Sequence, residues 1–279
     1  MAASIVPAMS DAHAGPDDGL PTDKLETLQV ERSHGVVTIT LDRPHRKNAV
    51  NEVMWNELEV TFRSIGARSE DRVVVITGAG GAFCSGADLS PGAAAVRGLA
   101  GMRHIGDVCL ALHNLPQPTI AKVNGIAAGA GLNMALGCDL VVASSDARFS
   151  EIFSRRGLSV DFGGSWVLPR LIGMQRAKEL VLLADIIDAA EAERLGLVNK
   201  VVPPEALDDA VADWSRRLAA GPPIALAQSK RLLDNSFSVT LEQAVDDESR
   251  AQTINFVTAD TAEAIAAFLE KRSPRFEGR

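Results

Sequence analysis

Two loops rich in glycine and alanine are the segments of the sequence best suited to chemistry. They are residues 78–89 (GAGGAFCSGADL) and residues 123–133 (VNGIAAGAGLN). Each follows an apolar run that reads as a buried strand, and small residues let a ligand approach the backbone closely. The second loop also opens a predicted helix, whose free N–H groups and positive dipole end suit a developing anion. The pattern predicts a backbone site for negative charge, with plain tight turns as the alternative.

Other uses of glycine-rich loops do not fit this sequence. Gly129-x-Gly131 is followed by Met134 where the dinucleotide-binding fingerprint has Gly or Ala. There is no G-x-x-x-x-G-K-[ST] segment, so phosphate transfer has no anchor, and no G-x-S-x-G segment to suggest a serine hydrolase.

The segments that must position these loops alternate between strand and helix patterns. Strands are predicted at 28–31, 36–41, 72–77, 119–123 and 139–143, and helices at 51–65, 95–115, 206–219, 224–236 and 240–271, with one further helix opened by 124–131 and running through residue 136. Asn51 is the predicted N-cap of the first helix. This alternation indicates an α/β layer architecture with a helical C-terminal third.

Composition excludes several classes of protein. The net charge is −8 without a basic cluster, so no nucleic-acid partner is expected. The three cysteines are widely spaced and read as reduced thiols, and the histidines lack metal-ligand spacing, so neither a disulfide framework nor a metal site is predicted. No apolar run reaches the ~18 residues of a membrane span. Residues 1–25 read as a disordered tail without targeting features, which makes the cytoplasm the expected location.

The two loops resemble the signatures of the enoyl-CoA hydratase/isomerase (crotonase) family. The resemblance extends over residues 26–279 in unbroken order. It includes TITLDRP at 38–44 followed by Asn48-Ala49, the segment 157–170, AERLGLV at 192–198 and FLEKR at 268–272. It implies a spiral of β-β-α units over 26–203 that holds the acyl-CoA site, and a helical C-terminal region over 204–279 that packs a homotrimer or hexamer.

The resemblance also implies where the substrate lies. The thioester oxygen of an acyl-CoA would sit between the backbone N–H groups of Ala87 and Ala130, and losing one such donor typically costs ~10²–10³ in rate. Coenzyme A would enter as part of the substrate, and no other cofactor is expected. By the same analogy, the residues that border the substrate are Arg46, Lys47, Ala49, Asp88, Leu89, Phe153, Phe268 and Lys271. The last two would come from a neighbouring subunit, with a solvated helix end as the alternative for Lys271, and Asp88 is expected to shape its loop rather than act as a base.

Both glutamates with which hydratases of this family activate water are replaced in this chain. Their positions match Asn133 and Phe153. Asparagine orients a water without taking its proton, and phenylalanine does neither. Glu151 lies two residues from Phe153, and a two-residue offset on a strand or a helix predicts that its side chain points elsewhere.

Asp161 is the carboxylate that matches an acidic position in some family members. In double-bond isomerases the equivalent residue resembles a proton shuttle, and in a dehalogenating branch it attacks the substrate. The sequence favours Asp161 as a base that moves a double bond, assisted by Asn133, with Phe153 keeping the pocket apolar and raising the pKa of the aspartate. The alternatives are an N-cap role for Asp161, a nucleophilic role in hydrolysis or dehalogenation, hydration in line with the family name, and a non-catalytic acyl-CoA binder.

Overall fold

Ten strands in the described part of the chain form two sheets of different size. The computed structural model describes residues 25–90 and 98–279. The larger sheet has the order β1-β2-β3-β5-β7-β10 and consists of β1 (Leu28–Ser33), β2 (Val36–Leu41), β3 (Val73–Gly78), β5 (Thr119–Val123), β7 (Leu140–Ser144) and β10 (Lys200–Val202). The smaller sheet has the order β4-β6-β8-β9 and consists of β4 (Ala82–Cys84), β6 (Ile126–Ala128), β8 (Arg148–Ser150) and β9 (Ile187–Asp188). Apart from the antiparallel pairs β1–β2 and β8–β9, the neighbours run parallel.

The chain winds through both sheets three times in a row. In each turn one strand enters the larger sheet, the next enters the smaller sheet and a helix follows: β3-β4-α2 (Leu99–His113), β5-β6-α3 (Ala130–Leu136) and β7-β8-α4 (Gly164–Leu183), the last after the 3₁₀ helix η3 (Ile152–Arg156). This confirms the predicted α/β spiral of β-β-α units.

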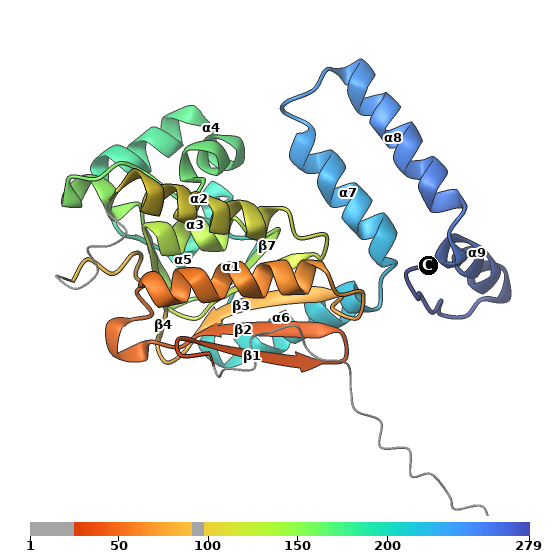
Figure 1. The fold of residues 1–279 in the computed structure, drawn as a ribbon, viewed down its shortest axis with the longest axis horizontal. Coiled ribbons are helices and arrows are strands. Elements are labelled where there is room, and N and C mark those ends of the chain that lie inside the picture. The colour runs from red at the N-terminus through yellow and green to blue at the C-terminus, as the bar shows by residue number, and fades with distance from the viewer. Residues whose placement is uncertain (1–24, 91–97) are drawn as a thin grey trace, which may run out of the picture.

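Helices cover both faces of the larger sheet (Figure 1). One face packs with α1 (Glu52–Gly66), α2 and α3 in the main core, and α5 (Ala189–Leu195) adds Ala189 and Ala192 to the same core. The other face is covered by α6 (Leu207–Ala219), which packs on Val73, Val75, Ile120 and Val142. Because alternate residues of β3 face opposite layers, all six of its residues are buried. Thus α6, predicted as the start of the C-terminal region, packs directly on the sheet.

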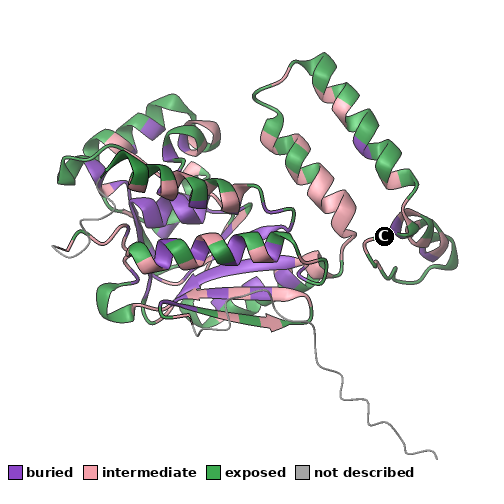
Figure 2. Cartoon of the chain, in the orientation of Figure 1, coloured by how far each residue is buried: buried purple, intermediate pink, exposed green. Residues whose placement is uncertain are grey.

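The remaining helices form an arm that extends from this body (Figure 1). It consists of α7 (Pro223–Asn235), α8 (Leu241–Phe256) and α9 (Ala259–Glu270). Figure 2 shows that the arm is mostly exposed or half-buried, whereas β3 and α3 are buried. The predicted single helix over 240–271 is wrong: Val257 ends α8, and the Thr258 side chain accepts a hydrogen bond from Thr261 N to begin α9.

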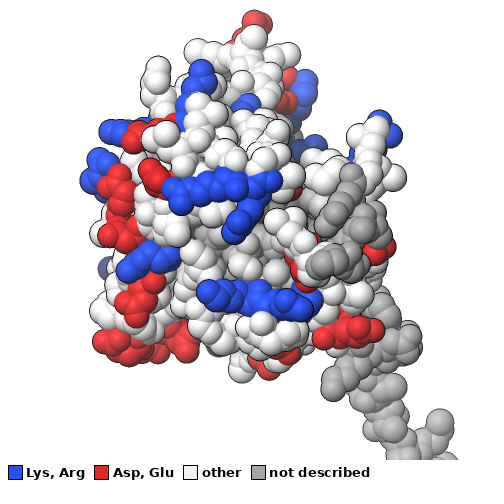
Figure 3. All heavy atoms as spheres, turned by 90° about the vertical axis from the view of Figure 1, so that its left-hand side faces the viewer, with Lys and Arg blue, Asp and Glu red and all other residues white. Residues whose placement is uncertain are grey.

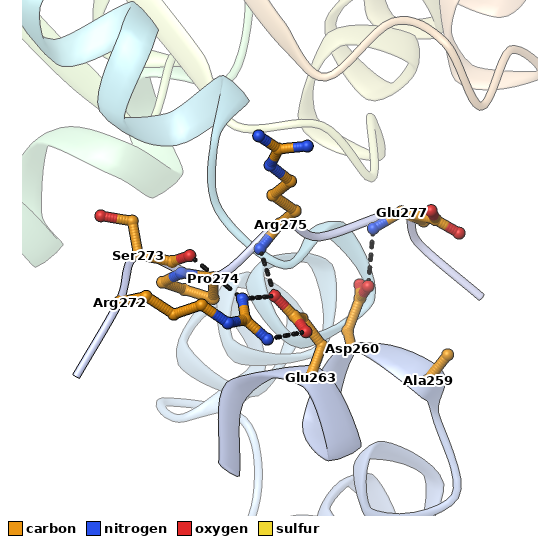
Figure 4. A pocket seen from close by; sticks show the side chains of 8 residues that line it. All are labelled: Ala259, Asp260, Glu263, Arg272, Ser273, Pro274, Arg275 and Glu277. Atoms are coloured by element: carbon orange, nitrogen blue, oxygen red, sulfur yellow. Dashed lines mark hydrogen bonds and ion pairs between the residues drawn. The ribbon is translucent and has the colours of Figure 1, made fainter. Parts of the chain in front are cut away.

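The C-terminal segment folds back on α9 (Figure 4). Asp260 accepts hydrogen bonds from the backbone N–H groups of Glu277 and Gly278. Glu263 pairs with Arg272 at 2.6 Å and accepts the backbone N–H of Arg275 at 2.8 Å. The residues that form these bonds line a groove beside α9, and none of the predicted catalytic residues lies in it.

Other sequence predictions meet mixed outcomes. Asn51 caps α1 by accepting from Met54 N, as predicted. Residues 124–131, predicted as a loop and helix start, contain the short strand β6. The predicted tail lies outside the described residues except for Leu25. Within residues 25–90 and 98–279, no helix is long and apolar enough to cross a membrane, and no group of three or more His, Cys, Asp or Glu residues is arranged to hold a metal ion.

Candidate active site

The two glycine-rich loops meet at Gly86 and Ala130. Gly86 has a φ of +97°, and a Cβ on it would lie 2.9 Å from Ala128 O and 3.7 Å from Ala130 N. A side chain at position 86 would therefore fill the space between the loops and strain the backbone as well. Because β4 and β6 are parallel neighbours, both loops leave the same edge of the smaller sheet.

The N–H groups of Ala87 and Ala130 are both available for a ligand. Ala87 forms an isolated parallel bridge with Val50. The hydrogen bonds of this bridge run from Val50 N to Gly86 O and from Asp88 N to Val50 O, so they do not use the Ala87 N–H. Ala130 is the first residue of α3, so its N–H has no acceptor within the helix. Neither N–H donates to any residue in the part of the chain that the structure describes. Two free donors on adjoining loops are suited to hold one carbonyl oxygen as its negative charge grows.

The loop with the predicted coenzyme contacts is attached to the first glycine-rich loop. The backbone carbonyls of Arg46 and Lys47 accept hydrogen bonds from the Ser85 hydroxyl and the Ser85 N–H, at 3.2 and 3.0 Å. Buried Asn48 donates from Nδ2 to Ala79 O and Ala82 O. The Arg46 and Lys47 side chains are exposed, so both are free to meet an anionic ligand.

Asp88 stabilises its loop through both carboxylate oxygens. Oδ2 accepts from Arg43 and Oδ1 from Ser90 N, each at 3.0 Å. These bonds, first of all that from the Ser90 N–H, lower the pKa of Asp88. Arg43 also donates to Ala49 O, which joins Ala49 to the same network, while the Leu89 side chain is 54% exposed.

Asp161 stands at the start of a tight turn before α4. Phe162 has a φ of +45° and Gly163 a φ of +76°. A positive φ is unusual for a bulky residue and is kept only where packing over-determines it. Phe162 is buried and stacks on Trp55 of α1 with ring centroids 5.5 Å apart. This contact, which no local sequence pattern predicts, anchors the turn and fixes where Asp161 emerges.

The Asp161 side chain makes no helix cap. The N-cap of α4 is Gly163, without a side-chain cap bond, so the capping alternative is wrong. Its Oδ1 is buried and has no hydrogen-bond partner among the described residues. Burial raises the pKa of Asp161 to about 6. A carboxylate that ionises near neutrality and has an unused oxygen has the properties of a general base.

Asn133 holds the backbone of Asp161 from α3. Its Nδ2 donates to Asp161 O at 2.9 Å, and Gly164 N donates to the same carbonyl at 3.0 Å. A carbonyl only accepts hydrogen bonds, so this contact fixes which end of the Asn133 amide faces Asp161. Asn133 is 1% exposed and lies flat against Gly164, where a Cβ would come within 2.4 to 2.6 Å of the amide atoms.

Replacing Gly164 by alanine is expected to displace the Asn133 amide and with it the carbonyl of Asp161. A misplacement of about 1 Å at a reacting group typically costs ~10²-fold in rate, and overpacking costs about 1–3 kcal/mol of stability. We expect turnover of an acyl-CoA substrate to fall by ~10- to 100-fold with a lower melting temperature. Gly106→Ala on α2 is the matched control, because its added Cβ meets nothing within 4 Å. Unchanged turnover in Gly164→Ala would show that the position of Asn133 does not matter.

Phe153 closes the apolar side of the second loop. It is 5% exposed, and its Cζ would lie 3.5 Å from a Cβ at Gly129, the residue before Ala130. Gly129 has a φ of +54°, so a side chain there would strain the backbone even though its Cβ would meet Phe153 only at van der Waals distance. The phenyl ring thus lies where the loop turns into α3.

Glu151 is the site residue that sequence reasoning rejected. Asn133 Nδ2 lies 3.4 Å from Glu151 Oε2, and the glutamate is fully buried. Burial, with a further contribution from Asp161, raises the pKa of Glu151 to about 8. Glu151 lies beside Asn133 whereas Phe153 lies beside Gly129, so the two side chains do point to different places. Glu151 nevertheless joins the site from the junction between β8 and η3, where neither strand nor helix periodicity applies. The sequence feature that could have identified Glu151 as a site residue is its position directly after a buried strand.

Two predicted substrate contacts are not brought to this site within one chain. Phe268 lies on α9 with 81% of its surface exposed. Lys271 is the exposed C-cap of α9 with a φ of +55°. Both belong to the arm, and α9 lies at the opposite end of the single chain from β4 (Figure 1).

Known proteins resemble this chain over nearly its whole length. Residues 31–279 match the sequence profile of the family described as Enoyl-CoA hydratase/isomerase. A probable enoyl-CoA hydratase of Rhodobacter capsulatus is 42% identical over 91% of this chain and 98% of its own. The 1,2-epoxyphenylacetyl-CoA isomerase of Escherichia coli is 38% identical over 88% of this chain and 96% of its own.

Solved structures share the fold as well. A putative enoyl-CoA hydratase of Streptomyces coelicolor superposes with a TM-score of 0.88 at 37% identity, covering 96% of this chain and 99% of the other. An enoyl-CoA hydratase of Bacillus anthracis gives a TM-score of 0.86 at 34% identity, covering 91% and 100%.

Proposed function

The chain belongs to the enoyl-CoA hydratase/isomerase family, and from this premise we propose that it moves a double bond within an acyl-CoA thioester, with Asp161 as the base. The single observation that carries the proposal is the Asp161 carboxylate. It has a raised pKa, a buried oxygen without a partner and a backbone held by Asn133. The printed name of the Escherichia coli relative, an isomerase, is consistent with this chemistry.

The proposed reaction needs one base and one pair of donors. The Asp161 carboxylate takes a proton from a carbon of the acyl chain, and the electron pair of that C–H bond moves onto the thioester oxygen. The N–H groups of Ala87 and Ala130 stabilise the resulting enolate. Asp161 then returns its proton to a different carbon, the double bond re-forms between other carbons and the carboxylate is regenerated. No atom is gained or lost.

Hydration is the runner-up, because Glu151 gives the site a second carboxyl group. Hydration requires a base and an acid that both reach the substrate or its water. Glu151 is fully buried behind Asn133, whereas Asp161 is only half-buried. Phe153 adds an apolar ring where the family resemblance expects a water-activating glutamate. These features favour isomerisation over the hydratase activity named for several relatives.

Two further alternatives use the same residues differently. Asp161 as a nucleophile would form an acyl-enzyme or displace a leaving group, so the product would lose part of the substrate. A non-catalytic binder would use the donors of Ala87 and Ala130 without proton transfer. The unused oxygen of Asp161 favours the base over the binder.

Product mass distinguishes these activities. Purified protein is mixed with 2-enoyl-, 3-enoyl- and dienoyl-CoA thioesters, and ultraviolet absorbance and mass are followed. We expect a change in absorbance with unchanged mass. A gain of one water would show hydration, release of free coenzyme A would show hydrolysis, and saturable binding without turnover would show a binder. Each of these three outcomes would contradict isomerisation.

The coenzyme end of the substrate is proposed to bind beside Arg46 and Lys47. Figure 3 shows the end of the molecule at the left of Figure 1, where Lys and Arg side chains form short rows beside uncharged surface. At a net charge of −8, local cations of this kind have to supply the attraction for the coenzyme phosphates.

The arm is proposed to assemble the chain into a homotrimer, or a hexamer of two such trimers. Large apolar side chains on α7–α9 are exposed in the single chain, among them Leu233 (72%), Phe256 (72%), Val257 (83%) and Leu269 (74%). Surfaces of this kind typically mark an interface between proteins. A second copy covering them would also bring Phe268 and Lys271 toward a neighbouring active site.

A charged residue on this apolar surface is expected to break the assembly. For the unmodified protein, light scattering should give three or six times the mass of one chain. Val257→Asp should shift the mass toward one chain, because burying an unpaired carboxylate is costly. Val60→Asp on α1 is the control, since Val60 is likewise exposed but lies outside the arm. An unmodified protein of single-chain mass would contradict the proposal.

The cytoplasm is the proposed location. Cys84, Cys109 and Cys138 are all free thiols, and burial raises the pKa of each, to about 12, 11 and 12. Free thiols that stay protonated are typical of proteins in a reducing compartment.

A further inference from the structure

Three buried oxygen atoms at the site have no hydrogen-bond donor. They are Asn133 Oδ1, Glu151 Oε1 and Asp161 Oδ1, and none has a partner among the described residues. Glu151 and Asn133 are at most 1% exposed, so bulk solvent does not satisfy them. Buried polar atoms without partners are rare and call for an explanation. Here the unsatisfied atoms lie on the proposed base, Asp161, and on two residues beside it.

Asn133 connects the two carboxyl-bearing residues. Its Nδ2 carries two hydrogens and has two acceptors, Asp161 O at 2.9 Å and Glu151 Oε2 at 3.4 Å. Gly164 confines the amide plane from the other side. Both donors of Asn133 are therefore used, and the three unsatisfied atoms are all acceptors.

A proton on Glu151 reduces this excess of acceptors. Two nearby carboxylates without a cation between them do not both ionise easily, because each charge opposes the other in a buried site. Cys109 faces Asp161 from α2, and its pKa of about 11 keeps it neutral. Arg155 and Arg156, on η3 after Glu151, are exposed, and Arg155 pairs with Asp185 at 2.6 Å. No cation among the described residues forms an ion pair with Glu151.

We propose that Glu151 is a positioning residue of this site, acting as a neutral carboxylic acid that holds the Asn133 amide and keeps a second negative charge away from Asp161. The proposal rests on the proposed role of Asp161 as base. Glu151 does not touch substrate. Its neutral form permits Asp161 to be the one ionised carboxylate beside a developing enolate. Ionised Glu151 would add a buried negative charge where the reaction creates another.

The proposal sets an upper and a lower limit on the active pH range. Asp161 has to be ionised, so activity is lost as the pH falls through about 6. Glu151 has to be protonated, so activity is lost again as the pH rises through about 8. The two groups interact, so these limits belong to the pair as a whole.

Two substitutions at position 151 test the role. Glu151→Gln keeps the shape and the acceptor for Asn133 but cannot ionise. We expect it to keep kcat/KM within about threefold at pH 7 and to lose the fall in rate above pH 8, while the acidic limit stays. Glu151→Leu removes the acceptor, and we expect kcat to fall ~10-fold or more at every pH with little change in KM. Glu205→Gln is the control, because Glu205 is exposed in η4 (Pro204–Ala206).

Three results would overturn the proposal. One is an alkaline limit in Glu151→Gln that matches the unmodified enzyme, which would assign that limit to another group. Another is full activity in Glu151→Leu, which would remove the positioning role. The last is loss of all activity in Glu151→Gln, which would make Glu151 a group that transfers protons itself.

Thermal unfolding gives a readout that does not depend on the reaction. Folding raises the pKa of Glu151 from 4.5 to about 8. A raised carboxyl pKa costs no stability below pH 4.5, and the cost grows as the pH rises to about 8. The melting temperature of Glu151→Gln should therefore exceed that of the unmodified protein by a margin that widens between pH 5 and pH 8. A constant margin would contradict the buried neutral acid even if isomerisation were confirmed, and a widening margin would support it even if isomerisation failed.

Discussion

Asp161→Asn is expected to abolish nearly all turnover while leaving acyl-CoA binding intact. A positioned general base contributes ~10²–10⁴-fold to the rate, and asparagine cannot accept the proton. The fold should survive, because the bonds from Asn133 and Gly164 go to the backbone carbonyl of residue 161. The carboxylate also has no cap bond to lose. Steady-state kinetics with the best substrate, together with a binding titration, measure both effects.

The control for this substitution is Asp209→Asn, on the exposed face of α6. It makes the same chemical change away from the site and should leave kcat unaltered. Retained turnover in Asp161→Asn would exclude Asp161 as the base. Loss of binding along with turnover would instead assign it to holding the substrate.

Ala130→Pro is expected to lower kcat/KM by ~10²–10³-fold, the usual cost of removing one donor from an oxyanion site. Ala130 is the first residue of α3, a position where proline is well tolerated because its N–H has no partner in the helix. The substitution thus removes the proposed donor without removing a helix hydrogen bond. Affinity for a substrate analogue should fall much less than the rate, because the donor matters most once the oxygen is charged.

Leu241→Pro is the matched control, because Leu241 is the exposed first residue of α8. It places the same ring at a helix start far along the chain from both loops, and turnover should stay within about twofold. Circular dichroism and the melting temperature establish that both variants fold. A folded Ala130→Pro variant with normal kcat/KM would show that this N–H does not bind the thioester oxygen.

Much of the fold was predictable because short sequence patterns determine where its strands and helices begin and end. The Val36–Leu41 and Thr119–Val123 strands fall where β-branched runs predict them, and Asn51 caps its helix through a side chain suited to that purpose. The loops around Ala87 and Ala130 were predictable because small residues after buried strands have few other uses. The structure then adds the contact at Gly86 that brings them together.

The missed features depend on tertiary contacts or on junctions. Glu151 was rejected on the assumption of regular geometry, and it lies where a strand passes into a 3₁₀ helix. The left-handed turn at Phe162 exists because the ring stacks on Trp55, a residue more than a hundred positions earlier. The break at Val257–Thr258 was hidden because both flanking helices have good helix formers and only the Thr258 cap separates them.

The smaller sheet makes the site modular. Its strands β4, β6 and β8 are parallel neighbours, so their carboxyl ends emerge in a row at one edge. Ala87 follows the end of β4, Ala130 the end of β6 and Glu151 the end of β8. Gly129 N donates a hydrogen bond to Ser150 O at 2.9 Å, which joins the last two of these segments. The ends of neighbouring strands are separated by roughly 4.8 Å, the spacing of paired strands. Replacing residues 151–163 by those of a relative would therefore exchange the carboxyl groups of the site together. The N–H groups of Ala87 and Ala130, which are proposed to bind the thioester oxygen, would stay in place.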